Sequence, residues 1–146
     1  MKYLLIFISM LLISCNTTTI NKNQQELDKH KNLWSTSKIT NYQYSYKRFC
    51  FCPQKEDIVV VVKEGVIYNA YYTPSDIYLD SEELKNLTSI DEYFDFIQDI
   101  INKKVFSLSV DYNSTFGYPM TISIDYYENA VDDKVTYKIF SLQSEI

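Results

Sequence analysis

The sequence predicts a small α+β domain in which an antiparallel sheet of about five to six strands carries two helices on one face. Three observations support this fold class. Several segments alternate apolar and polar residues, as strands with one buried face do. Two other segments repeat apolar residues every three to four positions, which is typical of amphipathic helices. The 146-residue chain has 14 Tyr and 8 Phe beside only 2 Gly and 3 Pro, a composition that favours a well-packed, sheet-rich domain.

The N-terminal segment indicates export. Lys2 precedes a short apolar stretch that ends at Ser14, which is the layout of a secretory signal. The stretch is about half as long as the roughly 20 residues that a bilayer-spanning helix needs. The residues Leu-Ile-Ser-Cys at 12–15 resemble the bacterial lipobox, whose cysteine, here Cys15, is acylated and becomes the new N-terminus. The alternative is an ordinary signal peptide whose cysteine enters a disulfide.

These features predict how the chain is organised. Residues 16–25 are polar and aperiodic, as linkers are. The lipid would hold the domain at a bacterial membrane without the domain touching it. Asn16 follows Cys15 and no acidic cluster marks surface display, so the expected location is the outer membrane, facing the periplasm. We expect a signal peptide over 1–14, a lipidated cysteine and polar tether over 15–25, and a single domain over 26–146.

The charge distribution limits the partners. The formal net charge is −5, Arg48 is the single arginine, and no basic patch is visible. This pattern argues against binding to nucleic acid. The expected partners are the membrane, through the lipid on Cys15, and an unidentified envelope protein or small ligand.

The domain begins with a predicted helix over about 26–39, where Leu27 and Trp34 recur at helical spacing and face the core. The period then changes to two. One side of the following strand carries three tyrosines, Tyr42, Tyr44 and Tyr46. If the strand stays regular until Pro53 ends it, the same side continues with Arg48, Cys50 and Cys52.

A β-hairpin is predicted next. The β-branched run 58–62 is typical of a strand that is covered on both faces or lies centrally in its sheet. Residues 63–65 supply a tight turn in which Gly65 takes a positive φ. The partner strand covers 66–72, and a polar loop covers 73–88.

A second helix opens at a capping box. Ser89 can accept from the Glu92 amide while Glu92 reaches back, which marks a helix start. The helix buries an apolar stripe, and its other side carries a row of three carboxylates, Asp91, Asp95 and Asp99. The row could collect Ca²⁺, although it lacks the looped oxygen cage that Ca²⁺ prefers; a solvated face is the alternative.

Three alternating segments complete the domain, and they predict strands over 106–112, 120–126 and 135–139. Turns connect them at 113–119 and 128–134. The resulting order is α-β-β-β-α-β-β-β, which implies an antiparallel sheet with the helices on one face.

The pair Cys50 and Cys52 has the clearest chemical potential. In an exported chain the simplest reading is a disulfide. Alternate residues of an extended strand lie about 6.6 Å apart, close to the upper limit of about 6.8 Å for a disulfide, so the chain would have to curl near Pro53. A redox-active thiol pair, a soft-metal site for Cu(I) or Zn(II), and a link between two chains are the alternatives.

The remaining residues offer no catalytic constellation. The chain has one histidine, His30, and it has no nucleophile elbow, phosphate-binding glycine loop or metalloprotease helix. We therefore predict no enzymatic activity, no cofactor and no metal site. Aromatic residues often line binding sites, so the tyrosines at 42, 44 and 46 are a candidate ligand or partner surface; a place in the core is the alternative.

The order of these motifs resembles a family of bacterial exported proteins known as domain of unknown function 6174. The resemblance covers roughly residues 30–140, and its most specific blocks are Cys50-Phe51-Cys52-Pro53 and Gly117-Tyr118-Pro119. The family brings no established activity. It therefore supports the prediction of one domain and leaves the function open.

Two functions are compatible with these observations. The first is a membrane-tethered, non-enzymatic module of the cell envelope that binds a partner or ligand. The second is a thiol-redox or soft-metal-binding protein that uses Cys50 and Cys52.

Overall fold

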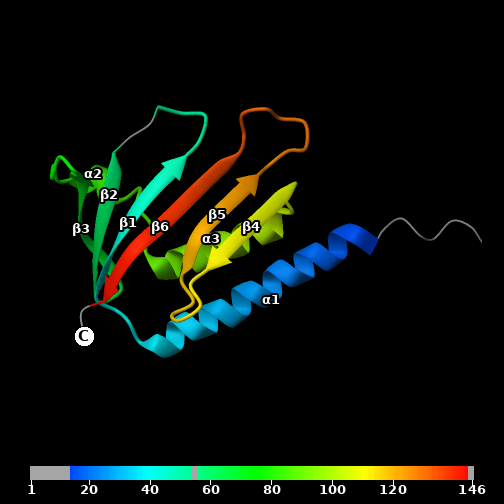
Figure 1. Cartoon of the computed structure of the whole chain (residues 1–146), viewed down its shortest axis with the longest axis horizontal. Helices are drawn as coiled ribbons and strands as arrows, with labels where there is room; N and C mark the ends of the chain where they lie inside the picture. Colours follow the sequence, from blue (N-terminus) through cyan, green and yellow to red (C-terminus); the bar gives the residue numbers. More distant parts are fainter. Residues whose placement is uncertain (1–13, 54–55, 145–146) are drawn as a thin grey trace, which may run out of the picture.

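The computed structural model describes residues 14–53 and 56–144 of the chain (Figure 1). Six strands form one sheet, and three helices accompany it. The elements are, in order, α1 (Ser14–Ser37), β1 (Tyr42–Phe49), β2 (Asp57–Lys63), β3 (Val66–Thr73), α2 (Ser81–Leu84), α3 (Ile90–Lys103), β4 (Ser107–Tyr112), β5 (Pro119–Asp125) and β6 (Val135–Ser144).

The sheet is antiparallel throughout, with the strand order β3-β2-β1-β6-β5-β4. The last strand of the chain, β6, therefore lies between β1 and β5 and joins the two halves of the sheet. The predicted fold class and element order are confirmed. The hairpin turn between β2 and β3 is also confirmed, because Glu64 and Gly65 both take positive φ angles, 50° and 77°.

Helices α1 and α3 cover the same face of the sheet. Trp34 of α1 meets the ring of Tyr42 edge-on at 5.4 Å, and the amino end of α3 lies against the same tyrosine. Buried side chains from both helices and from five strands form a single core. Its largest fully buried members are Tyr42, Tyr44, Phe94, Leu27, Ile90, Ile97, Ile100, Ile122, Ile124 and Ile139.

The start of α3 agrees with its predicted capping box. The Ser89 hydroxyl accepts the Glu92 amide at 3.3 Å, and the Glu92 carboxylate accepts the Ser89 amide at 2.7 Å. The apolar stripe faces the sheet, since Ile90, Ile97 and Ile100 are almost completely buried.

The predicted start of the first helix is wrong. The helix begins at Ser14, so the segment 15–25, expected to be a tether, is helical. Its last residues also dock on the domain, since the Asn23 amide donates to the Leu108 carbonyl at 3.3 Å and Gln24 pairs with Gln98 at 2.8 Å. These contacts of Asn23 and Gln24 are polar, so they leave no hydrophobic periodicity to detect.

The predicted signal peptide falls almost entirely on residues 1–13, which lie outside the described residues. Cys15 belongs to the first turn of α1. Among the helices of the described part of the chain, none has the length and hydropathy needed to cross a membrane.

The predicted loop 73–88 contains a short helix, α2. Asp80 and Glu83 form its capping box, but four residues are too few to show a helical period. The loop also continues the sheet briefly, because Tyr78 bridges Tyr71 and the Leu79 amide donates to the Ala70 carbonyl at 3.0 Å. The outer edge of β3 is thus partly covered.

Strand β2 is an inner strand with one fully buried face. Ile58, Val60 and Val62 point to the core, whereas Val59 and Val61 on the other face are half-buried. The β-branched run predicted a strand that is covered on both faces or lies centrally in its sheet. The structure shows the second environment, because β2 lies between β1 and β3 and does not have helices on both faces.

Candidate functional site

The three tyrosines of β1 have separate environments. Tyr42 and Tyr44 are 2% and 1% exposed and belong to the core, the alternative that the sequence left open for them. The Tyr42 hydroxyl accepts the Ile90 amide at 3.0 Å, and the Tyr44 hydroxyl donates to the Thr88 carbonyl. Tyr46 is half-buried and borders a hollow.

This hollow, called the aromatic hollow from here on, lies where β1 and β6 meet α3 and the segment before it. Its volume is about 160 Å³. The lining residues are Tyr44, Tyr46, Arg48, Asn86, Leu87, Thr88, Tyr93, Phe96 and Tyr137. Of the predicted tyrosine surface, the structure therefore brings Tyr44 and Tyr46 to a candidate site and leaves Tyr42 out of it.

Tyr137 is the centre of the aromatic hollow. Its ring stacks on Tyr46 at 6.5 Å, and the rings of Phe96 and Tyr93 meet it edge-on at 5.4 Å and 6.4 Å. Such offset and edge-to-face arrangements hold aromatic rings in place. The walls of the hollow are therefore ordered by contacts among the rings.

Arg48 is the single charged side chain among the lining residues. It is exposed, and its guanidinium carbon lies 5.9 Å from the ring centre of Tyr137, which is cation–π distance. The two residues are direct partners across the β1–β6 ladder, so the sheet register itself sets this contact. The hollow consequently has aromatic walls that also present polar groups, and it has a cationic rim.

The tyrosine hydroxyls of the hollow are neutral at physiological pH. Burial raises the pKa of Tyr46 to about 12, with a smaller contribution from neighbouring Tyr137 in the same direction. Burial also raises the pKa of Tyr137, although the Arg48 charge opposes this change. These hydroxyls therefore act as neutral hydrogen-bonding groups beside one fixed positive charge.

The volume of the hollow limits what it can hold. A cavity of about 150 Å³ is enough for a benzene molecule, whereas sites for larger ligands occupy about 300–1,000 Å³. The aromatic hollow therefore matches one ring-sized group, such as a single side chain of a partner, and is too small for a nucleotide-sized cofactor.

Cys50 and Cys52 are joined by a disulfide, with their Cα atoms 5.2 Å apart. The strand does not stay regular up to Pro53: β1 ends at Phe49, and the Cys52 amide donates to the Cys50 carbonyl at 2.8 Å in a tight turn. The cysteines are consequently not a continuation of the tyrosine side of β1. Within residues 14–53 and 56–144, no cluster of three or more metal-ligating side chains accompanies the pair.

The aspartate row of α3 is a solvated face that also contacts α1. Asp91 accepts the indole N–H of Trp34 at 3.2 Å, and Asp95 pairs with Lys31 at 2.7 Å. Asp99 is exposed. The carboxylates of Asp91 and Asp95 are thus engaged by different partners and do not converge on one point.

Sequence reasoning missed seven of the nine residues that line the aromatic hollow: Arg48, Asn86, Leu87, Thr88, Tyr93, Phe96 and Tyr137. Their chemical types were visible, but their proximity follows from the pairing of β1 with β6 and from the way α3 crosses these strands. Strand order is a long-range property that local periodicity does not encode.

Together, the fold and the hollow define a small antiparallel α+β domain with one aromatic recess and an arginine at its rim. The model of the family of unknown function DUF6174 matches residues 26–144, and the chain belongs to this family. The comparison with curated proteins gives no match.

Proposed function

We propose that this protein is a membrane-tethered, non-enzymatic binding module of the bacterial cell envelope and that the aromatic hollow is its binding site. The lipid attached to Cys15 would hold it on the periplasmic side of the outer membrane. The observation that carries the proposal is the convergence of Tyr46, Tyr93, Phe96 and Tyr137 around a recess with Arg48 at its rim.

The chemistry of the hollow favours one class of ligand. Its aromatic walls suit an apolar ring, and the ring-to-ring contacts already present leave those walls preorganised. The guanidinium of Arg48 suits a carboxylate, which an arginine can bind with two parallel hydrogen bonds. An aromatic group that carries or neighbours a carboxylate is therefore the expected ligand, as at an aromatic C-terminal residue or beside an acidic side chain of a partner protein.

Small aromatic probes test this proposal. Phenylacetate carries both features, and phenylacetamide is its uncharged counterpart. In a titration followed by backbone amide NMR, we expect phenylacetate to shift the signals of Tyr46, Thr88 and Tyr137, with a Kd on the order of 1 mM for so small a ligand. Phenylacetamide should bind more weakly.

Two variants sharpen the test. Arg48→Gln should bring the two probes to equal affinity, and its exposed position keeps the fold intact. Lys138→Gln removes an exposed positive charge one residue from Tyr137, on the opposite face of β6, and should leave both affinities unchanged. Shifts that are absent, or that spread evenly over the surface, would refute the hollow as the binding site.

Thiol exchange at Cys50 and Cys52 is the second candidate function. The observation that favours it is the exposed position of Cys52 in a disulfide that closes a very short ring. Mass spectrometry of the native protein, with and without alkylation, discriminates the two candidates. A pair that stays oxidised in mild reductant and carries no metal argues against the thiol function, whereas a reduced pair that holds Cu(I) or Zn(II) supports the soft-metal alternative.

A further inference from the structure

Exposed apolar side chains gather at one end of the sheet. Strand β1 ends there and β6 begins there, since Phe49 pairs with Thr136, and β5 ends beside the start of β4, since Asp125 pairs with Ser107. Three of the connections at this end, those after β1, α3 and β5, present large hydrophobic side chains to solvent. These are Phe51 (82% exposed), Phe106 (54%), Tyr127 (71%) and Val131 (93%), together called the apical tip.

The disulfide turn holds Phe51 outward. Cys50 and Cys52 are bonded to each other on either side of it, and their Cα separation of 5.2 Å is shorter than the roughly 6.6 Å of an extended chain. The hydrogen bond from the Cys52 amide to the Cys50 carbonyl closes the same turn. Phe51 therefore lies in a covalently closed bend that presents its side chain to solvent.

Helix α1 points its amino end toward the same end of the molecule. The Asn23 side chain bonds the carbonyl of Leu108, near the start of β4, and the helix continues outward from there to Ser14. At about 1.5 Å per residue, Cys15 lies about 12 Å beyond Asn23 along the helix axis. Figure 1 shows this end of α1 projecting past β4.

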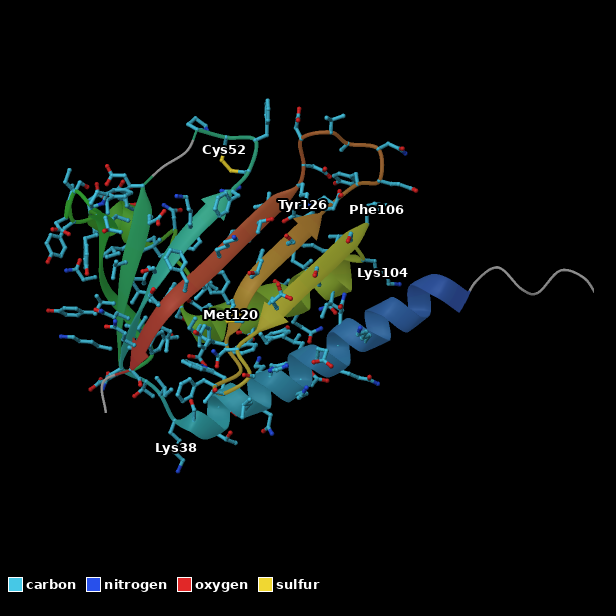
Figure 2. All side chains as sticks on the ribbon, in the orientation of Figure 1. Lys38, Cys52, Lys104, Phe106, Met120 and Tyr126 are labelled. Carbon is cyan, nitrogen blue, oxygen red and sulfur yellow. A yellow bond between two sulfur atoms is a disulfide. The ribbon has the colours of Figure 1, made fainter. Side chains whose placement is uncertain are left out.

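The side-chain view agrees with this placement. Figure 2 shows Cys52, Tyr126 and Phe106 at one end of the sheet, with Lys104 beside Phe106, whereas Met120 and Lys38 lie at the opposite end. A lipid on Cys15 and the apical tip would thus face the same side.

We propose that the apical tip inserts into the headgroup region of the same bilayer that anchors the lipid on Cys15. This inference rests on the lipid anchor of the proposed function, and it departs from the expectation that the domain is held at the membrane without touching it. Aromatic side chains favour the membrane interface, and exposed apolar clusters mark interaction surfaces.

The charges around the tip are compatible with a zwitterionic surface. The connection between β5 and β6 carries Glu128, Asp132 and Asp133, while Lys134 follows them and Lys103 and Lys104 precede Phe106. Because both signs are present, the contact does not depend on anionic lipid. Two attachments to one bilayer, the acyl chains and the tip, would fix the orientation of the domain.

Tryptophan depth measurements test this proposal. The full chain is expressed in a bacterium with Phe51→Trp, purified from membranes and reconstituted into phosphatidylethanolamine vesicles with or without bromine-labelled acyl chains. The matched control is Val66→Trp, which is 69% exposed at the opposite end of the sheet. Both variants retain buried Trp34, so its emission cancels in the comparison.

We expect the tryptophan at position 51 to emit at shorter wavelength and to be quenched several-fold more than that at position 66. Equal quenching at positions 51 and 66, in a chain whose intact mass shows acylation, would overturn the proposed membrane contact of the tip. The lipid anchor on Cys15 would then still be supported. A chain without acyl mass would overturn the anchor and, with it, this inference. Blue-shifted emission without quenching would assign the tip to contacts between protein molecules and contradict insertion.

Discussion

The hydroxyl of Tyr42 accepts the backbone N–H of Ile90 at 3.0 Å, so a side chain from the middle of the sheet caps the first turn of α3. Both residues are buried. The amino end of a helix has N–H groups without intrahelical partners, and Ser89 satisfies another of them through the Glu92 amide. This contact ties α3 to β1 and thereby sets the position of the wall that carries Tyr93 and Phe96.

Removing this hydroxyl should destabilise the fold. Tyr42→Phe leaves the buried Ile90 amide without a partner, and the expected loss in the free energy of unfolding is about 1–3 kcal/mol. Urea denaturation measures it. The control is Tyr68→Phe at an exposed tyrosine, where we expect a change below about 0.5 kcal/mol. Equal effects in the two variants would contradict the capping role.

Alanine substitutions at Gly65 and Gly117 distinguish the energetic cost of backbone strain from that of close packing. A Cβ on Gly117 would lie 2.4 Å from the His30 carbonyl oxygen, whereas a Cβ on Gly65 meets nothing within 4 Å. Both glycines have positive φ angles, so alanine is strained at either site by about 1–2 kcal/mol. Gly117→Ala should cost about 1–3 kcal/mol more than Gly65→Ala, because helix α1 has to shift. Similar thermal unfolding of the two variants would contradict this packing.

The contrast between these two glycines illustrates how far the sequence predicts the structure. Local signals were sufficient for the Glu64-Gly65 turn and for the start of α3 at Ser89, because the residues that define them are neighbours in the chain. The packing of Gly117 on α1 and the pairing of Arg48 with Tyr137 join residues far apart in the chain. No short-range pattern encodes such contacts, which is why the three β1 tyrosines could be assigned neither to the core nor to a site from the sequence.

The Cys50–Cys52 disulfide should contribute little to stability. The chain-entropy model gives about 1.6 kcal/mol for a loop of three residues. We expect the Cys50→Ser/Cys52→Ser double variant to fold and to lose less than about 2 kcal/mol in urea denaturation under oxidising conditions. A chain that fails to fold without the bond would show that the disulfide constrains more than its own turn.

Alkaline pH should unfold the domain through its buried tyrosines. Burial raises the pKa of Tyr44 and Tyr93 well above the usual value, and that of Tyr46 to about 12. A raised pKa in the folded state stabilises the neutral form. That stabilisation is therefore complete below about pH 10, where the unfolded chain begins to ionise, and it is lost as the pH rises through about 12.

Urea denaturation at about pH 8 and about pH 11 measures this loss. Tyr46→Phe removes one ionisable hydroxyl at the edge of the hollow, so this variant should lose less stability between the two pH values than the wild type does. Equal losses would show that Tyr46 ionises as freely in the folded domain as in the unfolded chain.

The most direct test of the aromatic hollow as the binding site is photo-crosslinking in living cells. A benzophenone amino acid placed at Tyr46 reports from the hollow, and the same group at Ser45, the adjacent residue of β1, reports from the opposite face of the sheet. We predict a discrete adduct from position 46 that is weakened by Arg48→Gln, and no such adduct from position 45. Identical adducts from both positions, or none from position 46, would contradict the proposal that the hollow receives a partner.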